Sequence, residues 1–120
     1  MKGRQPKRLA AKFSIVLLVA ASSLMTASQS RASSASAGTV TWIIALQNVV
    51  LFSQSGTRGA APACATDPQW VIDVTTPGGQ TMAAMLLSAY LAGKPVAVAG
   101  TSTCSLTPNS ETVAYVSLSQ

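Results

Sequence analysis

The feature that most constrains this chain is a single helix pattern enclosed by strand patterns. Residues 76–94 read TPGGQTMAAMLLSAYLAGK. Thr76 suits the N-cap, Pro77 suits the first helical position, and Gly93 suits the residue that ends the helix. The glycine pair after Pro77 weakens the first turn, so regular helix is expected over residues 80–92.

Apolar residues recur along this helix at spacings of three and four, which predicts one apolar stripe. We assign the stripe to the core rather than to a cofactor site. Such a helix must bury its stripe against other elements, so it needs a sheet beside it. The stripe comprises Met82, Met85, Leu86, Ala89 and Tyr90, and Leu87 and Leu91 widen it.

Runs rich in β-branched and aromatic residues predict five strands. TVTWIIAL and VVLF form a hairpin around Gln47 and Asn48, and WVIDV (70–74) precedes the helix. PVAVAG (95–100) and TVAYVSL (112–118) follow it. The order β-β-β-α-β-β is that of a small five-stranded OB-like barrel, in which the helix plugs one open end. We therefore expect a mainly β fold with one helix.

The two hairpin runs lack the strict alternation of a half-buried strand. Ile43 and Ile44 are adjacent apolar residues, and residues 49–52 form a continuous apolar run. Continuous apolar strands indicate burial on both faces, or a bulge in a strongly bent barrel strand.

The N-terminal segment has the composition of a secretory signal. Its head carries Lys and Arg without acidic residues, and an apolar run follows over residues 13–25. This run is shorter than the roughly 20 residues that span a membrane. A tract of small residues comes next, as at a signal-peptide cleavage site. A permanent N-terminal anchor is the alternative.

Ala35-Ser36-Ala37 is the best A-x-A match in that tract and predicts cleavage before Gly38, with sites near Ala27 or Ala32 as alternatives. We therefore expect residues 1–37 to be signal peptide and cleavage region. Residues 38–120 then form a single small OB-like domain. The protein is expected to be exported, to the periplasm or the extracellular space, and to meet the membrane only during export.

The basic charge belongs to the predicted signal. The chain carries a formal charge of +5, but six of its eight basic residues lie in the first 31 positions. After Ala37 the basic residues are two and the acidic residues three, so the charge is 2 − 3 = −1. Two cations cannot neutralise a series of phosphates, which argues against a nucleic-acid partner. The five charged residues are Arg58, Lys94, Asp67, Asp73 and Glu111.

Cys64 and Cys104 are the only cysteines, and a pair in an exported protein predicts a disulfide. A zinc site is the alternative, but two thiols without any His supply half of a tetrahedral shell. The absence of His also removes Ser-His-Asp and Cys-His catalysis. Three scattered acids argue against a glycosidase pair. We expect no enzyme activity, no catalytic residues, no cofactor and no metal.

The elements CAT (64–66), WVID, GGQ, LLSAYLAGKPV and GTSTCS together resemble a group of small exported bacterial proteins. More distantly, the helix-to-strand junction and the flanking cysteines look like the B subunit of subtilase cytotoxin. That resemblance implies an OB fold, assembly of binding subunits into a ring, and a glycan ligand. No glycan-contact residue is carried over from it.

Binding is the leading functional hypothesis, because OB-type barrels commonly bind sugars or oligonucleotides on a strand face. The expected partners are a glycan and further copies of the chain. The rival hypothesis is a structural subunit of an exported complex without a small ligand. Each candidate contact residue has the alternative of being an ordinary turn residue. The ligand-binding candidates are Gln47, Asn48, Asn109, Ser110 and Glu111.

Overall fold

The computed structural model describes residues 33–119 and has a mainly β fold with one helix. Six strands and the helix follow one another in the order β-β-β-β-α-β-β. They are β1 (Ser34–Gly38), β2 (Val40–Ala45), β3 (Val49–Gln54), β4 (Trp70–Asp73), α1 (Pro77–Ala92), β5 (Val96–Gly100) and β6 (Glu111–Leu118).

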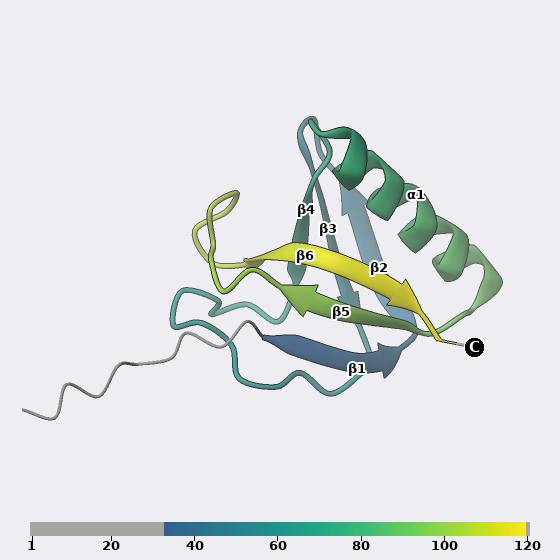
Figure 1. The fold of residues 1–120 in the computed structure, drawn as a ribbon, viewed down its shortest axis with the longest axis horizontal. Helices are drawn as coiled ribbons and strands as arrows, with labels where there is room; N and C mark the ends of the chain where they lie inside the picture. The colour runs from purple at the N-terminus through teal and green to yellow at the C-terminus, as the bar shows by residue number, and fades with distance from the viewer. Residues whose placement is uncertain (1–32, 120) are drawn as a thin grey trace, which may run out of the picture.

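The strands form one sheet in the order β1-β5-β6-β4-β3-β2. All neighbours are antiparallel except β4 and β6, which are parallel. Figure 1 shows β1, β5 and β6 side by side, crossing β2, β3 and β4 at a steep angle, with α1 along one side. The sheet is therefore strongly twisted, and its two halves enclose the core between them.

Strands β1 and β2 are nearly continuous in the chain, because only Thr39 separates them. They nevertheless lie at opposite ends of the strand order. β1 also bonds to the segment that follows β3: Ser36 N donates to Thr57 O at 3.0 Å, and Gly59 N donates to Ser34 O at 2.8 Å. The first strand of the described chain thus reaches both halves of the sheet.

The prediction of five strands is wrong, and the strand order describes an open six-stranded sheet rather than a closed barrel. The additional strand is β1, which lies in the tract of small residues that we assigned to signal cleavage. Small residues carry a weak strand signal because they show no apolar alternation. The predicted apolar segment at residues 13–25 lies outside the described residues.

Helix α1 begins at Pro77, three residues before the predicted start of regular helix. The Thr76 hydroxyl accepts a hydrogen bond from Gly79 N at 3.1 Å and so caps the first turn. The glycine pair does not prevent this turn from forming. Glycine is needed at position 79, because a Cβ there would overlap the Asp73 carbonyl oxygen. Gly93 ends the helix with a φ of 62°, as predicted.

The core lies between the two halves of the sheet and the inner side of α1. Leu86 and Ala89 of the helix are buried in it, which confirms the centre of the predicted stripe. Tyr90 was placed in the same stripe, but 43% of it is exposed. The buried apolar residues of the cluster are Ala35, Val40, Val50, Phe52, Trp70, Ile72, Leu86, Ala89, Val96, Val98, Val113 and Val116.

The predicted disulfide is confirmed. Cys64 lies in the loop before β4 and Cys104 in the loop after β5, with 6.1 Å between their Cα atoms. Close by in sequence, Asp67 N donates to Asn109 O at 3.0 Å. The disulfide and this hydrogen bond hold the two long loops together.

The two adjacent glycines of α1 provide a matched test of the helix start. Gly79→Ala should lower the free energy of unfolding by about 1–3 kcal/mol, because the new methyl group meets backbone. Gly78→Ala should raise it by about 0.5–1 kcal/mol, since nothing lies within 4 Å of a Cβ there and alanine favours helix. Urea unfolding measures both. Equal effects would contradict the close approach at Gly79.

Loss of the disulfide should lower the free energy of unfolding. The two cysteines are 40 positions apart, and closure of such a loop corresponds to roughly 4 kcal/mol. Urea unfolding of Cys64→Ser/Cys104→Ser against the oxidised protein measures the difference. A change below about 1 kcal/mol would mean that the loops are held without the bond.

Candidate functional site

The five predicted contact residues do not form one site. Gln47 and Asn48 are exposed at the turn between β2 and β3. Residues 109–111 lie at the other end of β4, where Trp70 pairs with Glu111. Because the Gln47–Asn48 turn adjoins the Asp73 end of β4, the length of that strand separates the two groups.

The candidates at residues 109–111 are engaged inside the protein. The Asn109 side-chain amide donates to the Asp67 carboxylate, which also accepts from Gln69 Nε2 at 3.4 Å. Ser110 is fully buried. Asn109 therefore links the two loops beside the disulfide, and Ser110 is enclosed next to it.

Glu111 is fully buried and is the most highly coordinated side chain in the described part of the chain. Its carboxylate lies 2.5 Å from Arg58 Nη2 and accepts a hydrogen bond from Ser102 N at 2.8 Å. The Ser33 hydroxyl donates to it as well. Arg58 in turn lies over the ring of Trp70, with its guanidinium carbon 4.0 Å from the ring centroid. This arrangement is a structural ion pair in which Glu111 is fully buried and the Arg58 side chain remains 17% exposed.

The ion pair can be tested by removing one partner. Glu111→Ala should lower the free energy of unfolding by about 3–5 kcal/mol, because it leaves the guanidinium largely buried without an opposite charge. Arg58→Met/Glu111→Leu should lose much less, since it leaves no uncompensated charge. Urea unfolding compares the two variants. A double variant as unstable as the single one would contradict this interpretation.

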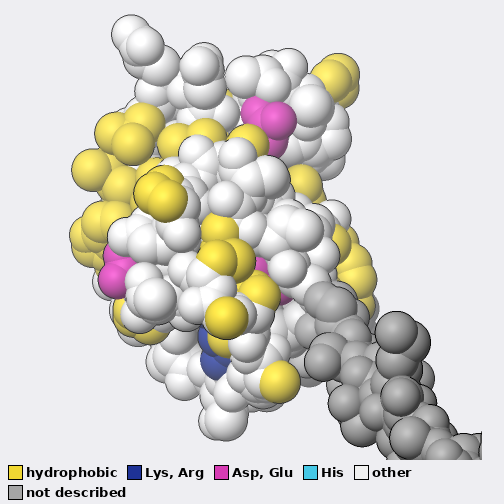
Figure 2. Space-filling view, turned by 90° about the vertical axis from the view of Figure 1, so that its left-hand side faces the viewer, with side chains coloured by type: hydrophobic (Ala, Val, Ile, Leu, Met, Phe, Trp, Pro, Cys, Tyr) yellow, Lys and Arg dark blue, Asp and Glu magenta, His cyan; other side chains and the backbone are white. Residues whose placement is uncertain are grey.

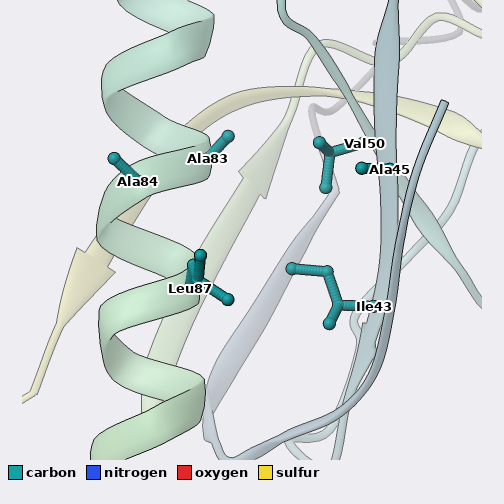
Figure 3. Close-up of a pocket in the computed structure, with 6 residues that line it drawn as sticks. All are labelled: Ile43, Ala45, Val50, Ala83, Ala84 and Leu87. Carbon is teal, nitrogen blue, oxygen red and sulfur yellow. The ribbon is translucent and has the colours of Figure 1, made fainter. Parts of the chain in front are cut away.

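An open apolar groove lies between α1 and the β2–β3 hairpin, with a cavity volume of about 300 Å³. Figure 3 shows Ala83 and Leu87 on the helix pointing toward Ile43 and Val50 on the strands. The groove is lined by Ile43, Ala45, Val50, Ala83, Ala84 and Leu87.

All six lining side chains are hydrocarbon, so the groove offers van der Waals contact and no acid, base or nucleophile. Its size is at the lower limit of small-molecule pockets, and it suits an apolar side chain. Charges do not surround it, because α1 and the β2–β3 hairpin contain no charged residue.

β2 exposes apolar side chains on its other face as well, because Trp42 and Ile44 alternate with the groove-lining residues of that strand. We call the strand β2 with Leu46 and the groove side of α1 the apolar edge. The apolar edge was not predicted from the sequence, although the adjacent apolar residues Ile43 and Ile44 were its signal. The large apolar residues exposed there are Trp42, Ile44, Leu46, Leu87, Tyr90 and Leu91.

Figure 2 views the side with the long loops, where a few charged side chains lie at separate points among polar and hydrophobic ones. Among residues 33–119, no three His, Cys, Asp or Glu side chains cluster as a metal site would require. No helix within the same residues is long and apolar enough to cross a membrane.

Asp73 closes the turn between β4 and α1. Its Oδ1 accepts from the Thr75 hydroxyl at 2.6 Å and from Thr75 N at 2.9 Å. These hydrogen bonds favour the ionised form and hold the pKa of Asp73 below its ordinary value of 3.8. The residue therefore positions the helix start and provides no proton donor near neutral pH.

The lowered pKa gives a signed pH dependence. Ionised Asp73 stabilises the fold above its unfolded pKa of about 3.8, and this contribution is lost as pH falls through the lower folded pKa. The stability difference between the wild type and Asp73→Asn should therefore be full at pH 7 and shrink in acid below that value. Urea unfolding across a pH series measures it. A difference that grows in acid would contradict the assignment.

Comparison with protein-family models, with curated proteins and with solved structures finds no match for this chain. The functional interpretation therefore depends on the chain's own geometry.

Proposed function

We propose that this chain is an exported, non-catalytic subunit that assembles with further copies of itself through the apolar edge. The observation that carries the proposal is that β2 is apolar on both faces while it lies at the end of the sheet. Trp42 and Ile44 are each 42% exposed, and Leu46 is 54% exposed. An exposed apolar edge strand is a template for pairing with another chain.

The backbone of β2 supports this proposal. Among the described residues, β2 pairs only with β3. Leu46 N donates to Val49 O at 2.8 Å, so alternate residues of β2 bond to β3. In an antiparallel ladder the intervening residues, Ile43 and Ala45, direct their N–H and C=O groups to the free edge. Two such edges pair antiparallel about a two-fold axis, since each offers the same donors and acceptors.

The lack of charge at the apolar edge favours a second copy as the partner. Edge strands are usually protected by lysine, proline or a covering loop, and β2 contains neither of these residue types. Two copies meeting here bring no like charges together. The groove beside β2 can then receive an apolar side chain of the partner.

We also propose that the fold is OB-like. It is supported by the helix between β4 and β5, by the parallel pairing of β4 with β6, and by the near continuity of β1 and β2. Hydrogen bonds between β1 and residues 57 and 59 also link β1 to the segment that follows β3. Together β1 and β2 then correspond to one bent first strand of such a barrel.

Export is supported by the disulfide, because such bonds persist in oxidising compartments. The basic head and apolar run at the N-terminus add to this support. Assembly outside the cytoplasm is consistent with a subunit that has few charges and a covalently fixed loop pair.

Light scattering of the exported protein tests the assembly. The wild type should have the mass of a dimer, because pairing of two β2 edges about a two-fold axis closes at two copies. Ile44→Lys should be a monomer, because the charge lies at the paired edge. Ala60→Lys, at an exposed loop position away from β2, should leave the mass unchanged. A monomeric wild type would overturn the proposal.

Glycan binding is the second candidate, and the exposed indole of Trp42 favours it because an aromatic face can stack on a sugar. A glycan array separates the two functions. Binding that is lost in Trp42→Ala supports a lectin role. A stable oligomer without any array signal supports assembly alone.

A further inference from the structure

We infer that the export signal is removed between Ala32 and Ser33, so that the exported chain begins at Ser33. This inference depends on the proposed export. It differs from the best sequence match, which places the cut after Ala37 and would remove strand β1.

Residues 33–38 belong to the folded domain. Ala35 is 4% exposed and lies in the core cluster, and Ser33 is 2% exposed. Gly100 N donates to Ser33 O at 2.7 Å, and the Ser33 hydroxyl donates to buried Glu111. A cut after Ala37 would therefore open the core and remove one partner of the buried carboxylate.

Packing accounts for the small residues of β1, which otherwise resemble a cleavage tract. A Cβ at Gly38 would overlap the backbone of Gly56, and a Cβ at Gly56 would overlap the Ser36 carbonyl oxygen. The Ser36 hydroxyl accepts from Thr57 N at 2.9 Å. Gly38 and Gly56 leave no room for side chains where these two segments approach each other, and Ala35 is buried, so the small residues at these positions have a structural origin.

The sequence before Ser33 contains one further A-x-A-like triplet that ends in alanine. Ser30-Arg31-Ala32 places small residues at the first and third positions, as signal cleavage requires. At Ala27 the corresponding first position is Met25, which is large. Cleavage after the triplet at residues 30–32 therefore leaves β1 intact and meets the small-residue requirement of signal-peptide cleavage.

Intact mass and N-terminal sequencing of the exported full-length chain test the inference. The expected product begins at Ser33 and contains one disulfide. A product that begins at Gly38 or Ser36 would overturn the inference, because the cut would then fall inside β1. A terminus at any other residue upstream of Ser33 would overturn the assignment to Ala32.

A pair of matched variants locates the cut independently. Ala32→Tyr places a bulky residue directly before the inferred scissile bond and should block or displace processing. Ala37→Tyr introduces the same side chain at an exposed position of β1 and should leave the N-terminus at Ser33. The reverse pattern would overturn the inference.

Failure of export itself gives a different result. A chain that stays in the cytoplasm with residues 1–32 attached and two alkylatable thiols would overturn the export proposal and this inference together. An oxidised, exported chain with another N-terminus would overturn only the cleavage position.

Discussion

A single buried carboxylate joins segments that the strand order leaves far apart. Glu111 begins β6, and it contacts Arg58 in the segment after β3, Ser102 after β5 and Ser33 at the start of β1. A buried charge is tolerated only when it is paired and hydrogen-bonded, so these partners must all be in place together. Gly100 leaves the space that the carboxylate occupies. The arrangement of both halves of the sheet depends on this contact.

The sequence predicted the elements whose side chains carry a periodic or chemical signal. The hairpin around Gln47 and Asn48, the capped helix, the later strands and the disulfide were all identified correctly. β1 was missed because its small residues serve close packing rather than burial of large side chains. The buried role of Glu111 was also missed, since a lone acid before a strand resembles a turn residue. Its partners come from distant segments that periodicity cannot pair.

The position of β2 at the edge of the sheet was also not predicted from the sequence. The adjacent apolar residues of β2 indicated burial on both faces or a bulge. The register of β2 on β3 does shift between Val40 and Trp42, but the strand lies at the end of the sheet, and Trp42 and Ile44 are partly exposed. β2 has the apolar pattern of a central strand but lies at the edge of the sheet. This combination is consistent with a sheet that another chain completes. Helix α1 beside it also has no charged residue and exposes large apolar side chains. In a single copy of the chain, apolar residues of β2 such as Trp42 and Ile44 remain partly exposed.

The position of β1 in the sheet has a consequence for the order of folding. Ser34 pairs with Ala99, 65 positions later in the chain, whereas β2 and β3 pair locally across a tight turn. Closing such a distant contact is slow relative to hairpin formation. In a chain that emerges N-terminus first, β1 has no partner strand until residues 96–100 of β5 have emerged. The first described strand to emerge is therefore among the last to be paired.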